Sequence, residues 1–309
     1  RDQPRSRGLG DVYKRQGFGN MKDQTEKKKK IKEAPIFYAV NYILLTIIAL
    51  GCLVPFFNVV AKAFSTYGKT VIILPRDFTW FNFQQVFGDV AYFRAFGVSV
   101  GVTLSGTLFS VGFMLMAAYP LSKKDLPFRK GIMIFFMIVM LFSGGIVPNF
   151  FVMKILGLLN TPFALVLPSL VQVYNLILLK NALEGVPAEL EESARIDGAG
   201  NARILAGILM PVLLPAISSV ALFTAVTYWN NYFNALLYLI NAENYYPLSM
   251  FILNKINSVP DILGDQQLYH QKTYIEAAMI IVSILPIVCA YPFVQKFFVR
   301  GLTVGSVKG

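Results

Sequence analysis

The stretch ELEESARIDGA at residues 189–199, followed by ILMP at residues 208–211, is the most polar internal part of a chain that is otherwise mostly apolar. Long apolar runs lie on both sides of it. Charged side chains are costly inside a bilayer, so a charged segment between two hydrophobic spans must lie in water at a membrane face. The stretch therefore marks a place where the chain leaves the membrane and where another protein can reach it.

Local chemistry predicts a short amphipathic helix here, then a glycine break and a second helix that enters the membrane. Pro187 suits the first helical position, because proline loses no needed N–H there. The acidic residues that follow lie in the first turns, where the helix dipole favours negative charge. Gly198 suits the left-handed conformation that ends many helices. A helix of this kind is suited to docking in a groove on another protein.

Composition predicts a polytopic membrane protein. Of the 309 residues, 55% are hydrophobic, and the mean hydropathy of +0.56 is far above that of a soluble domain. The two cysteines, Cys52 and Cys289, lie within apolar runs, and His270 is the single histidine. We therefore expect no disulfide framework, no metal site and no cofactor. The sequence shows no catalytic arrangement of side chains, so we also expect no enzyme activity.

Six apolar runs reach the roughly 20 residues that a helix needs to cross a bilayer. The third run contains a break at Gly144, Gly145 and Pro148. The fifth is longer than one crossing, so we expect it to tilt or to begin as an interfacial helix. The pattern predicts an all-α membrane protein with six transmembrane helices. The runs cover residues 35–61, 93–118, 131–153, 162–182, 206–240 and 274–295.

The first 34 residues form a basic N-terminal arm. Residues 1–20 show no periodicity and Met21 is typical of a natural start, so we interpret the first twenty residues as non-native. The apolar run that begins near Ala34 has no small-residue cleavage site behind it. It predicts a retained first transmembrane helix over residues 35–61 instead of a signal peptide.

The basic residues predict the orientation of the chain. With the N-terminus inside, the inner segments hold ten Lys and Arg residues without the basic arm, and the outer segments hold six. The positive-inside rule then places both termini and the 189–199 stretch on the cytoplasmic side, with the chain multi-pass in the membrane. The net charge of +11 is thus explained by orientation and contact with membrane lipid, and no nucleic-acid partner is expected.

The fifth run carries polar side chains at three- and four-residue spacing, which predicts one polar face on a continuous helix. Two interpretations stay open. The face can line a translocation path, since hydroxyls, amides and aromatic rings suit a sugar, or it can hydrogen-bond to other helices, at about 0.6 kcal/mol per contact. Candidate path residues are Thr227, Tyr228, Asn231 and Asn234, with Thr224 and Tyr238 on the same predicted face.

Three other signals are weaker. The segment from Ala63 to Thr70 ends in Gly-Lys-Thr as phosphate loops do, but it lacks the first glycine and follows a membrane span. We expect no nucleotide there, so an ATP-driven process needs a separate ATPase. A small-residue stripe at Gly97, Gly101 and Ser105 predicts close helix packing. Glu276 is expected at an interface or facing a cavity, with a gating or substrate role as the alternative.

The spacing Glu192-Ser193-Ala194, three residues, Gly198, nine residues, Ile208-x-Met210-Pro211 resembles the coupling-loop motif of ABC importer permeases. The family pattern reads Glu-Ala-Ala, three residues, Gly, nine residues, Ile-x-Leu-Pro. The resemblance implies a helix that docks in a cleft of a cytoplasmic ATPase. It implies docking roles for Glu192, Ala194, Asp197 and Gly198, within a loop that also includes Ser193 and Pro211.

The resemblance extends over about residues 35–309. The segments GLLNTP at 157–162, IDGA at 196–199, WNNYF at 229–233 and GLTVGSVKG at 301–309 resemble carbohydrate-importer permeases, in the subunit class of the smaller maltose permease and the branch for complex oligosaccharides. It implies an ABC type-1 transmembrane domain over residues 91–296. It also implies a cytoplasmic tail over 297–309, expected to be flexible, that reaches the ATPase through Gly301, Leu302 and Lys308.

The resemblance implies import of sugars or oligosaccharides by alternating access, across the cytoplasmic (inner) membrane of a bacterial cell. The implied partners are a homologous second permease in a heterodimer, a cytoplasmic ATPase dimer and an extracytoplasmic sugar-binding protein. The alternative function is an ion-coupled secondary transporter of small polar solutes. That class favours inverted repeats and paired intramembrane ionisable groups, and neither is visible in the sequence.

Overall fold

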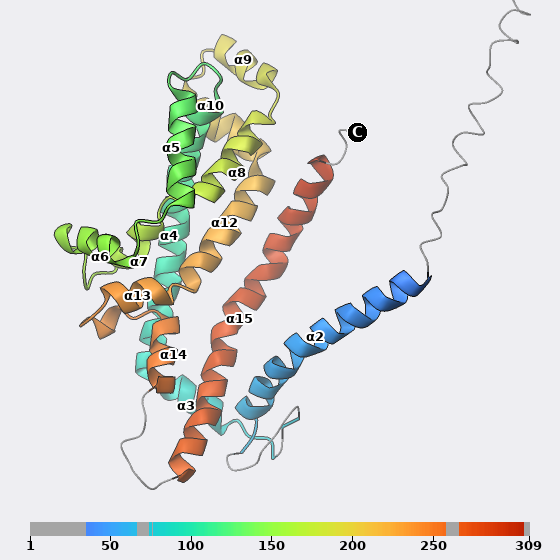
Figure 1. The fold of residues 1–309 in the computed structure, drawn as a ribbon, viewed down its shortest axis with the longest axis vertical. Coiled ribbons are helices and arrows are strands. Elements are labelled where there is room, and N and C mark those ends of the chain that lie inside the picture. Colours follow the sequence, from blue (N-terminus) through green and yellow to red (C-terminus); the bar gives the residue numbers. More distant parts are fainter. Residues whose placement is uncertain (1–34, 67–73, 76, 258–265, 306–309) are drawn as a thin grey trace, which may run out of the picture. The chain divides into compact units, whose positions relative to one another are not determined.

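The computed structural model describes residues 35–66, 74–75, 77–257 and 266–305 (Figure 1). The chain divides into two units, residues 1–56 and residues 57–309. Over the described residues the secondary structure is helical, and the one β-bridge joins Ser65 to Phe78. The predicted all-α class is confirmed.

The helices follow one another with short connections. They are α2 (Pro35–Ala63), α3 (Phe81–Gly88), α4 (Val90–Ser122), α5 (Arg129–Leu141), α6 (Ile146–Ile155), α7 (Phe163–Val166), α8 (Val173–Glu184), α9 (Ala188–Ile196), α10 (Asn201–Ile204), α11 (Met210–Val212), α12 (Leu214–Trp229), α13 (Tyr232–Tyr238), α14 (Leu248–Asn257) and α15 (Gln266–Gly305). Three short turns complete the set: η1 (Leu167–Ser169), the π-helical η2 (Leu205–Leu209) and η3 (Glu243–Tyr245).

Three helices are long and apolar enough to cross a membrane, over residues 37–63, 90–122 and 271–290. Three further spans are bent pairs of helices, so the described residues hold up to six spans. The first bent pair is α5 with α6, whose axes differ by 111°. The sequence predicted this break, and Gly145 enables it with a φ of 86° that a side chain would disfavour.

The fifth apolar run begins as a separate segment, which agrees with the expected interfacial start, but it is not the continuous helix that the spacing of its polar residues predicted. Its first part, residues 201–212, meets α12 at 87°, because Pro215 in the first turn of α12 has no N–H to continue the preceding helix. Its last part separates at Asn230 and Asn231, where α12 ends and α13 begins after a turn. The polar residues from Thr224 to Tyr238 therefore do not share one helical face.

Helix α12 is the centre of residues 57–309 and packs against α4, α8 and α15. Tyr228, near its end, is 1% exposed. The Tyr228 hydroxyl donates to the carbonyl of Val166 at 3.0 Å and accepts from the Ser110 hydroxyl at 2.7 Å. One side chain thus joins α12 to α4 and to α7.

The close approach of α4 to α12 occurs at Gly106. A Cβ added there would lie 2.8 Å from two atoms of the Tyr228 ring. By contrast, nothing lies within 4 Å of a Cβ at Gly97 or Gly101. This chain therefore does not pack its own helices closely at Gly97 or Gly101. The close contact is at Gly106, one residue after Ser105, the last member of the predicted stripe.

We expect Gly106→Ala to destabilise the protein, because the buried and hydrogen-bonded Tyr228 ring cannot move aside. Overpacking of this kind costs about 1–3 kcal/mol. The measurement is the midpoint of thermal unfolding in detergent. Gly101→Ala on the same helix is the matched control, and an equal effect of both changes would contradict the packing argument.

Candidate functional site

The predicted docking segment is α9, which lies with α10 at one end of residues 57–309, opposite α3 and α14 (Figure 1). The helix begins at Ala188, and Pro187 is its N-cap with φ −56° and ψ 133°. The start is one residue later than predicted, because Pro187 takes an extended ψ that a helical residue does not have. Glu189 and Glu191 lie in the first turn as expected.

Gly198 ends the helix as the sequence predicted, with a φ of 78°. The Gly198 N–H donates to the carbonyl of Arg195 at 3.0 Å, and the Ala199 N–H donates to the carbonyl of Ala194 at 2.9 Å. These two bonds form a Schellman motif. Asp197 is the C-cap residue immediately before the glycine. The motif fixes the angle at which the chain turns from α9 toward α10.

The faces of α9 differ in exposure. Glu192 and Ser193 are exposed, and Ile196 is 87% exposed, an apolar side chain that the sequence analysis did not single out. Ala194 is only 6% exposed and belongs to an apolar cluster of this chain. Its small size is therefore needed by the core of this chain, and the side chain is not available to a groove on another protein as the resemblance implied.

Ion pairs join α9 and α8 to the turn between α4 and α5. Lys123 pairs with Glu191 of α9, and its ammonium also lies 4.6 Å from the centre of the Tyr119 ring. Glu184 at the end of α8 pairs with Arg129 and, at 2.8 Å, with Lys180. The sequence analysis treated the three basic residues only as orientation charges. The partners of Lys123 and Arg129 lie 68 and 55 residues away and are not apparent from spacing. The Lys180–Glu184 pair has the i,i+4 spacing of helix neighbours and could have been predicted.

The segment after α10 anchors this end of the chain in the apolar core. Leu209, in the ILMP stretch, is fully buried and belongs to the same apolar cluster as Ala194. Pro211 is exposed in the short helix α11. The core thus holds the chain on both sides of the exposed residues at 195–198.

The four candidate path residues are not equivalent. Tyr228 and Asn231 are buried, and the Asn231 amide donates to the carbonyl of Leu165 at 2.6 Å. Both residues therefore make hydrogen bonds to other segments of the chain, which was the alternative to lining a translocation path. Thr227 is exposed and its hydroxyl donates to its own helix at Phe223. Asn234 is half-buried in α13 and borders a cavity.

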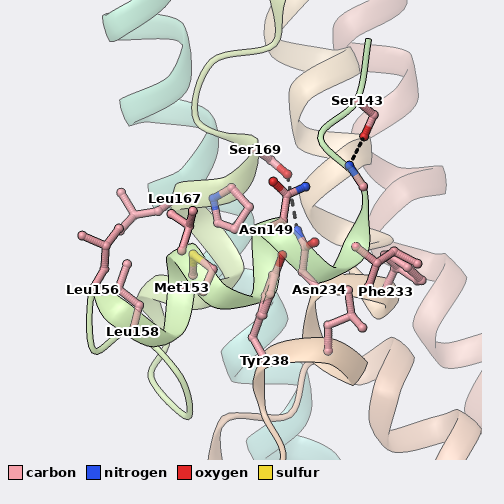
Figure 2. A pocket seen from close by; sticks show the side chains of 15 residues that line it. Ser143, Asn149, Met153, Leu156, Leu158, Leu167, Ser169, Phe233, Asn234 and Tyr238 are labelled. Carbon is pink, nitrogen blue, oxygen red and sulfur yellow. Dashed lines mark hydrogen bonds between the residues drawn. The ribbon is translucent and has the colours of Figure 1, made fainter. Parts of the chain in front are cut away.

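Figure 2 shows this cavity, which has a volume of about 510 Å³ and lies between the α5–α6 bend, η1 and α13. The uncharged polar side chains of Asn149, Ser169 and Asn234 point into it, with the Tyr238 hydroxyl nearby. Apolar residues, among them Met153, form the rest of the wall. Of the elements that line the cavity, α13 follows the end of α12 that is remote from α9, and α6 lies toward that same end (Figure 1).

The C-terminal residues differ from the expected flexible tail. Helix α15 continues to Gly305 and includes Gly301 and Leu302. It runs toward the end of the unit at which α9 lies (Figure 1). Lys308 lies outside the described residues. The sixth span was predicted over residues 274–295, and the apolar stretch long enough to cross a membrane covers residues 271–290. The helix itself continues beyond the span to Gly305.

Residues 90–304 match the family described as binding-protein-dependent transport system inner membrane component. The chain belongs to this family. It is therefore a multi-pass permease of the inner membrane that works with an ATPase and a substrate-binding protein, and it is not an enzyme. An ion-coupled secondary transporter, the alternative, is not favoured.

Individual relatives agree with this assignment. The chain is 38% identical to the polygalacturonan/rhamnogalacturonan transport system permease protein YtcP of Bacillus subtilis, over 89% of this chain and 99% of the relative. It is 30% identical to the arabinooligosaccharides transport system permease protein AraQ of Halalkalibacterium halodurans, over 91% and 100%. The structure is similar to that of a bacterial ABC transporter that imports the acidic polysaccharide alginate, with a TM-score of 0.78, 30% identity and coverage of 86% and 98%.

We expect the Lys123–Glu191 pair to hold α9 in register with α4. Lys123→Glu places two negative charges together and should destabilise the permease by about 1 kcal/mol, the upper value for a partly exposed pair. The double variant Lys123→Glu, Glu191→Lys should recover most of that loss. Thermal unfolding midpoints and substrate uptake would be measured for the two single variants and the double variant.

Lys124→Glu is the matched control for this experiment. It makes the same change of charge at an exposed neighbouring residue. If Lys124→Glu lowered stability and uptake as much as Lys123→Glu, the loss would come from the change of charge at this membrane face, and the ion pair would not contribute to stability.

Proposed function

We propose that this chain is the permease subunit of an ATP-driven importer of oligosaccharides, coupled to its ATPase through α9 and the Schellman turn at Gly198. The relatives named above transport carbohydrates by their descriptions, which supports the substrate class. The observation that carries the coupling role is the exposed end of α9. There a rigid backbone turn presents Glu192 and Ile196 to the outside.

Coupling requires a segment that is both exposed and rigidly held. Ala194 and Leu209 bury the inner side of this segment in the core, and the Lys123–Glu191 pair ties it to the α4–α5 turn. A displacement of Ile196 or Glu192 by the ATPase is therefore transmitted to the ends of α4, α5 and α8. In this proposal Ser193, Asp197 and Pro211 complete the exposed surface or shape its backbone, and Ala194 acts by packing.

The arrangement in the membrane follows from the same proposal. The end with α9 faces the cytoplasm together with both termini, as the ten-to-six distribution of basic residues favours. Residues 1–34 form a basic arm, 35–61 the first span, 91–296 the transmembrane domain and 297–309 the cytoplasmic end. Gly301, Leu302 and Lys308 lie toward the ATPase, and α15 supports this because it runs toward the α9 end.

The partners in this proposal are a homologous second permease, two ATPase copies and an extracytoplasmic sugar-binding protein. Closure of the ATPases on ATP moves α9, and the helices that pack on α12 open toward the outside. The translocation path passes Thr227 and Asn234, whose side chains are not enclosed by the core. Tyr228 and Asn231 shape the path indirectly, since their hydrogen bonds fix how α12 and α7 meet.

We expect Gly198→Val to uncouple transport, because a β-branched residue at a φ of 78° is strained by about 1–2 kcal/mol and opens the Schellman turn. Sugar-stimulated ATP hydrolysis and uptake in the assembled complex should both fall at least about fivefold, the factor for 1 kcal/mol. Gly200→Val is the control, since Gly200 has a φ of −73° and open space around it. Wild-type rates for Gly198→Val would overturn the coupling role.

We also expect Ile196→Asp to release the ATPase from the permease. Ile196 is 87% exposed, so the change leaves the permease core intact but places a charge in an apolar contact. The measurement is co-purification of the ATPase and the second permease from mildly solubilised membranes. Glu192→Ala should weaken ATPase recovery in the same way, and Glu189→Ala on the same helix is the control. Retention of the ATPase by both test variants would mean that α9 is an ordinary loop helix.

A further inference from the structure

The cavity between the α5–α6 bend, η1 and α13 contains polar groups that converge from separate elements (Figure 2). Asn149 comes from α6, Ser169 from η1, and Asn234 and Tyr238 from α13. Amides and hydroxyls that meet in a cavity with otherwise apolar walls are typical of a small-molecule site. Its volume of about 510 Å³ lies within the 300–1,000 Å³ range of such sites.

These polar groups have hydrogen-bonding capacity to spare. The Asn234 amide donates to the Ser169 hydroxyl across 3.4 Å, which is a long bond. Among the described residues, the Asn149 amide and the Tyr238 hydroxyl make no side-chain hydrogen bond. An asparagine side chain can donate twice and accept twice. The site can therefore bond several hydroxyl groups of a ligand at once.

The lining is uncharged. None of the fifteen lining residues is Lys, Arg, His, Asp or Glu. A carboxylate placed here would lose water without gaining a cation, which is costly. Hydroxyl groups would exchange their water for the amides and hydroxyls described above. The chemistry therefore favours an uncharged sugar unit over a uronate.

We propose that this cavity is a carbohydrate subsite of the permease that accepts an uncharged sugar unit of the transported chain. The inference rests on the proposed import function. It adds the location of a sugar-binding subsite and the preference of that subsite for an uncharged sugar unit. The sixteen residues of α12, at 1.5 Å each, separate its two ends by about 24 Å. The cavity is lined by α13, which follows the end of α12 remote from α9. With α9 on the cytoplasmic side, as proposed above, it is a subsite near the side from which substrate enters.

Substituted-cysteine protection tests the subsite directly. Cys52 and Cys289 are exposed, so both are first replaced by Ser in the assembled complex. Val152→Cys places a thiol on the cavity wall, and Val147→Cys places one on the same helix outside it. Both valines are exposed, at 53% and 64%. The probes are α-1,4-linked galactobiose and α-1,4-linked digalacturonate, which differ only at C6, where the first has hydroxymethyl groups and the second has carboxylates.

We expect galactobiose to slow thiol labelling of Val152→Cys at least about fivefold, while digalacturonate has little effect and neither sugar protects Val147→Cys. Equal labelling of both variants with and without galactobiose would overturn the subsite. Protection of Val152→Cys by digalacturonate as strong as that by galactobiose would overturn its preference for an uncharged unit.

Uptake measurements separate this inference from the proposed function. Asn149→Ala and Ser169→Ala should each raise the half-saturating concentration for uptake of the neutral sugar about fivefold, the effect of losing one hydrogen bond. Asn230→Ala, whose amide bonds only its own helix, should leave it unchanged. Unchanged half-saturation in both cavity variants would overturn the subsite alone. Failure of the unsubstituted complex to take up any oligosaccharide with ATP would overturn the import function.

Discussion

The contact on which the rest of the structure depends is the burial of Tyr228 between α4, α7 and α12. Its ring occupies the space left by Gly106, and its hydroxyl bonds both Ser110 and the carbonyl of Val166. Inside a bilayer a polar group without such partners would be costly. The two bonds and the missing Cβ therefore select one arrangement of the three elements, and α8 and α15 pack around it.

This fixed centre separates two ends with different chemistry. At one end, charged side chains such as Lys123 and Glu191 join α9 to the neighbouring helices, and the exposed surface carries Glu192 and Ile196. At the other end, the cavity near Asn149 and Asn234 is uncharged. Because α12 connects both ends through the buried Tyr228, a movement of α9 has a rigid route toward the cavity. In the proposed importer, we infer that this route couples ATP hydrolysis to substrate movement.

The candidate site was only partly predictable from sequence. The spacing around Glu192 and Gly198 located α9, since it depends on residues close together in the chain. The polar residues at 224–238 were recognised as unusual for a membrane span, but their roles were not separable. Tyr228 and Asn231 bond distant carbonyls, whereas Asn234 borders a cavity whose other walls come from residues 143–169. A polar residue in a membrane span indicates that its side chain needs a hydrogen-bond partner. The sequence does not show whether that partner is another helix or a ligand.

What the sequence by itself determined is the class of the protein: an all-α membrane chain, a water-exposed segment at 189–199 and a left-handed Gly198. These features depend on composition and on one residue's backbone freedom, which act locally. Only the tertiary structure decided that the fifth run breaks twice, that Ala194 packs inward and that Glu191 pairs with Lys123, 68 residues away. Those outcomes depend on which distant surfaces meet, and a sequence pattern does not contain that geometry.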